Sequence, residues 1–158
     1  MLSTTGFGVA FYKGTRPGLP GVYNRLVRCF ENGPDSHCEI VFSNGDSASA
    51  SAMDGGVRTT GDAYGHWKIN FSNGNWDFIP LPQRLEEFAR AYSIEHDGWS
   101  YDYRGNVRFL WPYGNRHSYQ KEFCSEFVLG ALGVPEPWRF GVNPARAVCE
   151  WIGANDGR

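Results

Sequence analysis

Short runs of alternating or continuous apolar residues dominate the first half of the chain and predict β-strands. The first run, GFGVAFYK at 6–13, is followed by a break rich in proline and glycine. Between His37 and Pro80 lie further short runs: HCEIVFS, SASASA, GGVRTT, HWKINF and WDFIPL. Asn44-Gly45 separates two of them and favours a type I′ turn, because both residues tolerate positive φ. The middle of the chain is therefore predicted to be an antiparallel sheet.

Apolar residues at helical spacing predict a short helix after the first strand and a second helix that opens at Pro82. The packed face of the first helix is expected to consist of Val22, Leu26, Cys29 and Phe30. The second helix ends at Gly98, and its apolar face consists of Leu85, Phe88, Ala89 and Tyr92. Its outer side is expected to carry Glu86, Glu87 and Arg90.

Two more helices are predicted in the last part of the chain, over 124–132 and 143–152. Asn143 suits the N-cap of the later helix, and Pro144 its first helical position. Strands that come first and helices that cluster later indicate an α+β fold. A length of 158 residues is typical of one domain, so we expect a single domain over 1–158.

The alternation SASASA over 47–52 predicts a strand with one face of small side chains. Such a face lets a helix or a ligand approach closely. A tight core contact is the commoner cause, and both explanations remain open at this point.

The composition predicts a folded protein: 41% of the residues are hydrophobic and 20% are charged. The net charge is −2 and no run of Lys or Arg is present, which argues against a nucleic-acid partner. No apolar run reaches about 18 residues, and no basic segment precedes an apolar stretch at the N-terminus. We expect a soluble, cytoplasmic protein without a signal peptide or a transmembrane segment.

The cysteines are Cys29, Cys38, Cys124 and Cys149, and free thiols are expected because a chain of this length does not need disulfides to fold. No CxxC pair occurs, and the neighbours His37 and Cys38 would point to opposite faces of a strand. A structural metal is therefore not favoured.

Cys124 stands at the predicted start of a helix, in KEFCSEFVLGAL. Unpaired backbone N–H groups and the positive end of the helix dipole stabilise a thiolate there, and the same groups can hold an oxyanion. The alternative is structural, because free cysteines are often buried on the inner face of an amphipathic helix.

A nucleophilic thiol needs a base, and His37 is the best candidate because it begins a strand directly after a turn. Glu39 lies two residues further on, hence on the same face, where it could orient the imidazole. His96 and His117 lie in polar, loop-like contexts and are expected to be solvated. His66 is expected to be an ordinary packed histidine.

The runs SHCEIVFSNG, SAMDGGVR, GWSYDYRGN and FCSEFVLGAL together resemble the circularly permuted NlpC/P60 group of papain-like proteins. The YiiX/YaeF-like proteins and small phage-encoded relatives share this order, in which the histidine precedes the cysteine. The resemblance spans roughly residues 7–133. It implies a permuted papain-like fold, in which an antiparallel sheet packs against helices and the nucleophile lies at a helix N-terminus.

The resemblance implies that Cys124 is the nucleophile, His37 the base and Glu39 the orienting group. In ordinary NlpC/P60 proteins the third polar residue lies on the neighbouring strand, where Ser49 is the candidate here. Tyr101 matches a tyrosine that either donates to the oxyanion or packs. Asp102 and Glu126 are the other matched polar residues. Asp102 belongs to the Tyr-Asp turn, and the negative charge of Glu126 interacts favourably with the dipole at the start of the helix.

The chemistry implied is acyl transfer through a thioester, without metal or organic cofactor, on a peptide, amide or ester substrate. If the protein is phage-encoded, the host cytoplasm or a virion is its expected location. Two alternatives stay open. One is a catalytically silent binding module or host-interaction protein that uses the same cleft, and the other is a lipid acyltransferase.

Overall fold

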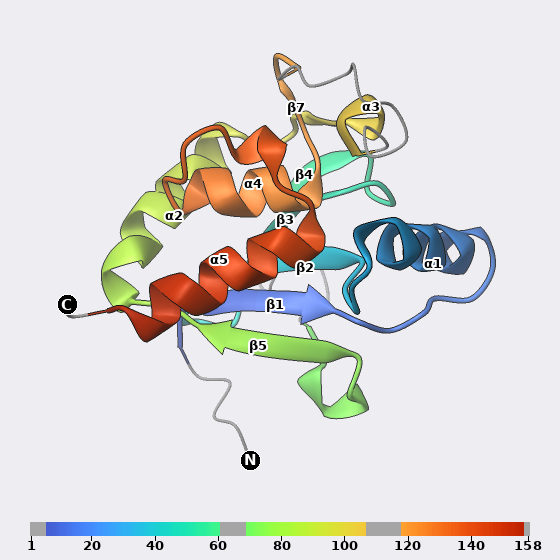
Figure 1. Cartoon of the computed structure of the whole chain (residues 1–158). Helices are drawn as coiled ribbons and strands as arrows, with labels where there is room; N and C mark the ends of the chain where they lie inside the picture. The colour runs from blue at the N-terminus through green and yellow to red at the C-terminus, as the bar shows by residue number, and fades with distance from the viewer. Residues whose placement is uncertain (1–5, 61–68, 107–117, 157–158) are drawn as a thin grey trace.

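The computed structural model describes residues 6–60, 69–106 and 118–156. These residues form a seven-stranded sheet of order β5-β1-β2-β3-β4-β6-β7, with helices packed against it (Figure 1). The strands are β1 (Gly8–Tyr12), β2 (His37–Val41), β3 (Ser47–Ser51), β4 (Gly56–Thr60), β5 (Trp76–Pro80), β6 (Ser100–Tyr101) and β7 (Lys121–Glu122). All neighbouring pairs are antiparallel except β6 and β7. The predicted α+β class is confirmed at this level.

The helices are α1 (Leu19–Glu31), α2 (Glu86–Glu95), α3 (Tyr103–Asn106), α4 (Cys124–Ala131) and α5 (Val142–Ala154). Figure 1 shows α4 and α5 across one face of the sheet, with α1 beyond the end of β1. Only residues 32–36 connect α1 to β2, so the start of β2 lies near the end of α1. No helix in the described ranges combines the length and the apolar character that a membrane span requires.

The core lies between the sheet and α4, and the Ser/Ala alternation of β3 explains how closely they pack. Ala48 and Ala50 are fully buried in this core, together with Phe127 and Leu129 of α4. Alternation along β3 turns its serines to the opposite face. The small-residue face is thus a core contact, and the serines are left for a polar face.

The second face of the sheet carries a smaller apolar cluster and a buried polar network. Ala10, Tyr12, Val41 and Trp76 form the apolar cluster. Glu39 pairs with Ala10 in the register of β1 and β2, so its side chain lies on this same face. The sheet therefore separates an apolar helix-covered side from a side that can hold charge.

Helix α2 differs from the prediction in where its polar and apolar side chains lie. Phe88 is 55% exposed, whereas Glu86, expected outside, is buried. The carboxylate of Glu86 accepts hydrogen bonds from the backbone N–H and the hydroxyl of Ser43 and pairs with Arg90. The helix ends at Glu95, before Gly98. Periodicity alone could not reveal this tertiary hydrogen-bonding partner.

The predicted packed face of α1 is wrong: Val22, Leu26 and Phe30 are about half exposed, and Cys29 is exposed as well. The buried residues of α1 are Gly21, Asn24 and Val27, and Asn24 accepts the backbone N–H of Arg16. Helical spacing does not specify which face tertiary packing covers.

Two boundary predictions are also wrong. Helix α5 begins at Val142 after Gly141, and Asn143 is not its N-cap. The Asn143 side chain instead donates to Glu31 and to the backbone oxygen of Asp35. Of the predicted strand HWKINF, residues 66–68 lie outside the described residues, and residues 69–71 form no strand.

Candidate active site

Cys124 is the first residue of α4, and Phe123 precedes it in an extended conformation without a side-chain cap. The first backbone N–H groups of the helix therefore stay available near the thiol. Cys124 is buried, and its thiol lies close enough to the His37 ring and to Cys38 for both side chains to lower its pKa. The structure thus brings together two residues, Cys124 and His37, that lie far apart in the sequence.

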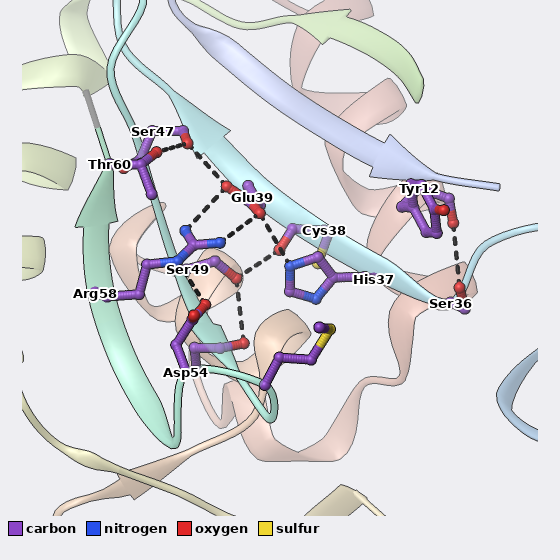
Figure 2. A network of polar contacts seen from close by, with 12 residues as sticks. Tyr12, Ser36, His37, Cys38, Glu39, Ser47, Ser49, Asp54, Arg58 and Thr60 are labelled. Atoms are coloured by element: carbon purple, nitrogen blue, oxygen red, sulfur yellow. Dashed lines mark hydrogen bonds and ion pairs between the residues drawn. The ribbon is translucent and has the colours of Figure 1, made fainter. Parts of the chain in front are cut away.

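His37 begins β2 and is held by contacts on two sides. Its Nε2 lies 3.2 Å from Oε1 of Glu39 (Figure 2). The ring also packs edge-on against that of Trp76, with 6.2 Å between the centroids. Use of Nε2 by Glu39 leaves Nδ1 as the ring nitrogen for Cys124. The imidazole is therefore fixed between a thiol and a carboxylate.

Glu39 is buried and is bound by two side chains besides His37, those of Arg58 and Ser47. Arg58 makes a bidentate pair with it, with Nη2 2.9 Å from Oε1 and Nη1 3.1 Å from Oε2. The Ser47 hydroxyl donates to Oε2 at 2.8 Å, and Asp54 holds Nε of Arg58 at 2.9 Å (Figure 2). Such a bidentate pair fixes the plane of the carboxylate as well as its charge.

Sequence analysis missed Arg58. It lies on β4, opposite Ser49 in the register of β3 and β4, whereas the predicted Asn44-Gly45 turn connects β2 to β3. Ser49 itself donates to the backbone oxygen of Cys38 at 2.7 Å. The residue of β3 that reaches Glu39 is Ser47, two positions earlier.

The pKa values of the site shift toward an ion pair. Burial lowers the pKa of His37, but hydrogen bonds to Cys124 and Glu39 outweigh it and raise the value to about 9. The hydrogen bond from Cys38 lowers the pKa of Cys124 most, burial opposes this, and His37 lowers it further. Although burial raises the pKa of Glu39, Arg58 and His37 hold it far below its usual range. These directions favour a thiolate, an imidazolium and a carboxylate at neutral pH.

Tyr101 is buried on β6, and its hydroxyl belongs to a short chain of polar groups. Nδ2 of Asn106 donates to the Tyr101 oxygen at 2.7 Å, and the Tyr23 hydroxyl lies 3.2 Å away. Burial raises the pKa of both tyrosines, and the nearby Cys124 raises it further. Both hydroxyls therefore stay protonated donors close to the thiol. Tyr23, on α1, was not identified from the sequence.

The other two matched polar residues have local contacts. Asp102 accepts from the backbone N–H groups of Arg104 and Gly105, and so shapes the start of α3. Glu126 is buried in the first turn of α4.

A cavity of about 230 Å³ opens beside the site. His37 and Tyr101 line it, together with Tyr23, and Arg16 and Met53 line it as well. Cys124 is buried and is not one of the described lining residues, but its neighbours His37, Tyr23 and Tyr101 line the cavity wall. A substrate carbonyl placed in the cavity would meet the imidazole and the tyrosine hydroxyls, next to the thiol.

His96 and the cysteines other than Cys124 have different surroundings. His96 is buried, not solvated, because its ring lies between those of Tyr92 and Trp99, each 3.8 Å away between centroids. His66 and His117 lie outside the described residues. All four cysteines are free thiols, with Cys29 exposed. Within the described ranges, no group of three or more His, Cys, Asp or Glu side chains is arranged to hold a metal ion.

Comparisons with models of protein families, with curated proteins and with solved structures returned no match to this chain. The chemistry of the site therefore has to be inferred from its own geometry.

Proposed function

We propose that this chain is a cysteine-dependent hydrolase, which transfers the acyl group of an amide or ester to Cys124 and then to water. One observation carries the proposal. Cys124, at the N-terminus of α4, contacts an imidazole that is fixed by a buried carboxylate, and the pKa shifts of both groups favour the ion pair. A nucleophile, a base and an orienting group in hydrogen-bonding sequence are the arrangement that thiol catalysis requires.

In the first step the Cys124 thiolate attacks the substrate carbonyl carbon and a C–S bond forms. The electron pair of the carbonyl moves to its oxygen, where the backbone N–H groups at the start of α4 can donate to it. We assign the Tyr101 hydroxyl as a side-chain donor to the same oxyanion. As the intermediate collapses, the bond to the leaving nitrogen or oxygen breaks and that atom takes the proton of His37.

In the second step His37, now neutral, takes a proton from water as the water oxygen attacks the thioester carbonyl. The C–S bond breaks, the acid product leaves, and the thiolate–imidazolium pair is restored. Glu39 stabilises the imidazolium in both steps, and Arg58 keeps Glu39 ionised and in place. The proposed mechanism uses only side-chain and backbone groups of this chain.

The proposal fits the resemblance of the motifs to the permuted NlpC/P60 group, and we extend it to a permuted papain-like fold. The described order of elements, with the histidine on an early strand and the cysteine on a later helix, supports this extension. The proposed substrates are peptides, other amides or esters that fit the cavity.

An activated ester tests the proposal without knowledge of the natural substrate. We expect p-nitrophenyl acetate to give a stoichiometric burst of p-nitrophenolate and an acetyl group on Cys124 that hydroxylamine removes. Cys124→Ala should abolish the burst, while Cys149→Ala should retain it, because burial raises the pKa of Cys149 to about 12. Acetylation of Cys124 no faster than that of exposed Cys29 would favour the silent binding module instead.

A further inference from the structure

The cavity beside His37 carries an arginine that the proposed chemistry does not use. Arg16 lies on the segment between β1 and α1 and lines the cavity together with His37 and Tyr23. Its guanidinium lies over the Tyr12 ring, 5.2 Å from the centroid, and its Nη1 contacts the sulfur of Met53. These contacts hold a positive charge at the cavity wall.

The segment that carries Arg16 is fixed by α1. The backbone N–H of Arg16 donates to Oδ1 of Asn24 at 3.3 Å, and Arg28 donates to the backbone oxygen of Lys13 at 3.1 Å. Gly21 lies so close that a Cβ there would be 1.9 Å from the Arg16 backbone oxygen. The guanidinium is therefore presented by a packed segment, which lowers the entropic cost of binding a partner.

No carboxylate in the described part of the chain pairs with Arg16, whereas Glu39 pairs with His37. Carboxylates on the surrounding elements pair elsewhere: Asp35 pairs with Arg146, and Asp54 with Arg58. Glu31 accepts the backbone N–H groups at the start of α5. No carboxylate of the described residues lines the cavity or lies within 4.0 Å of the Arg16 guanidinium.

We propose that Arg16 makes this cavity selective for substrates that carry an anionic group, such as a carboxylate, next to the scissile bond. This inference rests on the proposed hydrolase function and adds the substrate class. A volume of about 230 Å³ lies below the range of roughly 300–1,000 Å³ that holds drug-sized ligands. The cavity therefore suits one residue-sized group, and a guanidinium that is fixed in place binds a planar carboxylate in two-point fashion.

Two alkylating reagents of similar size test the charge preference directly, because iodoacetate is anionic and iodoacetamide is neutral. We measure the rate constant of each at Cys124 by mass spectrometry, and take their ratio for the wild type and three variants. Arg16→Gln should lower the ratio of iodoacetate to iodoacetamide about five-fold, and Arg16→Lys should retain most of it. Arg25→Gln is the matched control, since it removes the same charge from an exposed position of α1 outside the cavity.

Equal ratios in Arg16→Gln and Arg25→Gln would overturn the anion preference. Slow labelling of Cys124 by both reagents would instead count against the hydrolase proposal. A binding measurement then decides the question for Arg16 on its own: in Cys124→Ala protein, N-acetylglycine should bind at least about five-fold more tightly than N-acetylglycinamide. The additional Arg16→Gln change should remove that difference, and equal binding before the change would refute the proposal.

Discussion

The described residues contain two buried histidine–glutamate pairs, and the surroundings of the pairs differ. In one, Nε2 of His37 lies 3.2 Å from Glu39, and in the other, Nδ1 of His96 lies 3.1 Å from Glu122. The distances and the burial of the carboxylates are nearly the same, but the His37 pair has hydrogen-bond geometry and the His96 pair does not. A histidine held by a buried carboxylate is therefore not in itself a sign of catalysis.

The neighbours of each pair make the difference. His96 lies between two aromatic rings, and Glu122 accepts the Tyr92 hydroxyl at 2.5 Å, so this pair ties α2 to β7. His37 instead faces the Cys124 thiol at a helix N-terminus, and a guanidinium compensates its carboxylate. The site that we propose as catalytic differs in two ways. It holds a nucleophile, and negative and positive groups alternate along it, from the thiolate through the imidazolium and the carboxylate to the guanidinium.

Replacement of the nucleophile should have the largest effect on this contrast. We expect Cys124→Ala to reduce turnover to the uncatalysed background, a loss of about 10³-fold or more, because the neighbouring thiol, Cys38, is fully buried and its pKa is raised by that burial. The fold should persist, since alanine favours helices and is small. Ester turnover and circular dichroism check both statements, and a variant that retains turnover would show that Cys124 is not the nucleophile.

The two glutamates should respond in opposite ways to loss of charge. Glu39→Gln should lower turnover about ten-fold or more, because the imidazolium loses its orienting carboxylate. Glu122→Gln should leave turnover of the folded protein nearly unchanged and lower the free energy of unfolding by about 1–3 kcal/mol. Kinetics and urea unfolding of both variants measure this. Similar turnover losses in both would mean that the His96 pair also contributes to the chemistry.

Because Glu39→Gln also leaves Arg58 buried without its main partner, stability has to be separated from catalysis. Glu39→Gln combined with Arg58→Met removes both charges and should recover much of the lost stability. Turnover should stay low in the double variant. Recovery of turnover along with stability would assign Glu39 a structural role only.

The pH dependence of turnover should sharpen the role of the first pair. The pKa of His37 is raised to about 9, so the imidazolium that protonates the leaving group is lost as the pH rises through that value. Turnover should therefore fall on the alkaline side near pH 9, and Glu39→Gln should move this limb to lower pH. A pH–rate profile of kcat measures it. An alkaline limb that stays in place in Glu39→Gln would show that Glu39 does not act through His37.

Acid stability follows from the depressed pKa of Glu39. The stabilisation from this carboxylate is complete above its ordinary value of 4.5 and is lost as the pH falls below that value toward the lowered pKa. The difference in unfolding free energy between the wild type and Glu39→Gln should therefore shrink on acidification. Urea unfolding at several pH values below neutrality tests this, and a difference that grows in acid would contradict the charge assignment.

The smallest effect is expected at Ser49. Its hydroxyl binds the backbone oxygen of Cys38, so Ser49→Ala should cost about 1 kcal/mol of stability and change turnover less than about two-fold. The same assays apply. Damage as severe as that of Cys124→Ala would place the orienting group on the neighbouring strand, contrary to the role proposed for Glu39.

Local patterns in the sequence predicted the elements of the site well. The alternation of side chains along a strand placed His37 and Glu39 on one face. Apolar residues at helical spacing, followed by a glycine, predicted the helix that begins at Cys124. Both are properties of adjacent residues, which the backbone repeat fixes. The α+β order could be predicted for the same reason.

Contacts between distant segments could not be predicted in this way. Arg58 meets Glu39 only through the registers of two hairpins, and Tyr23 meets Tyr101 only because α1 lies near β6. His96 looked solvated because its neighbours in sequence are polar, yet Tyr92 and Trp99 fold over it. Such errors are expected wherever tertiary packing decides the environment of a polar side chain.

The pH dependence of alkylation at Cys124 tests the central claim, a thiolate–imidazolium pair, most directly. Iodoacetamide labelling of Cys124 should proceed at a nearly constant rate between about pH 6 and 8, because the thiolate is already formed there. His37→Gln should remove this plateau. A wild-type rate that rises about ten-fold per pH unit over the same range, as for a free thiol with an ordinary pKa near 8.5, would contradict the account.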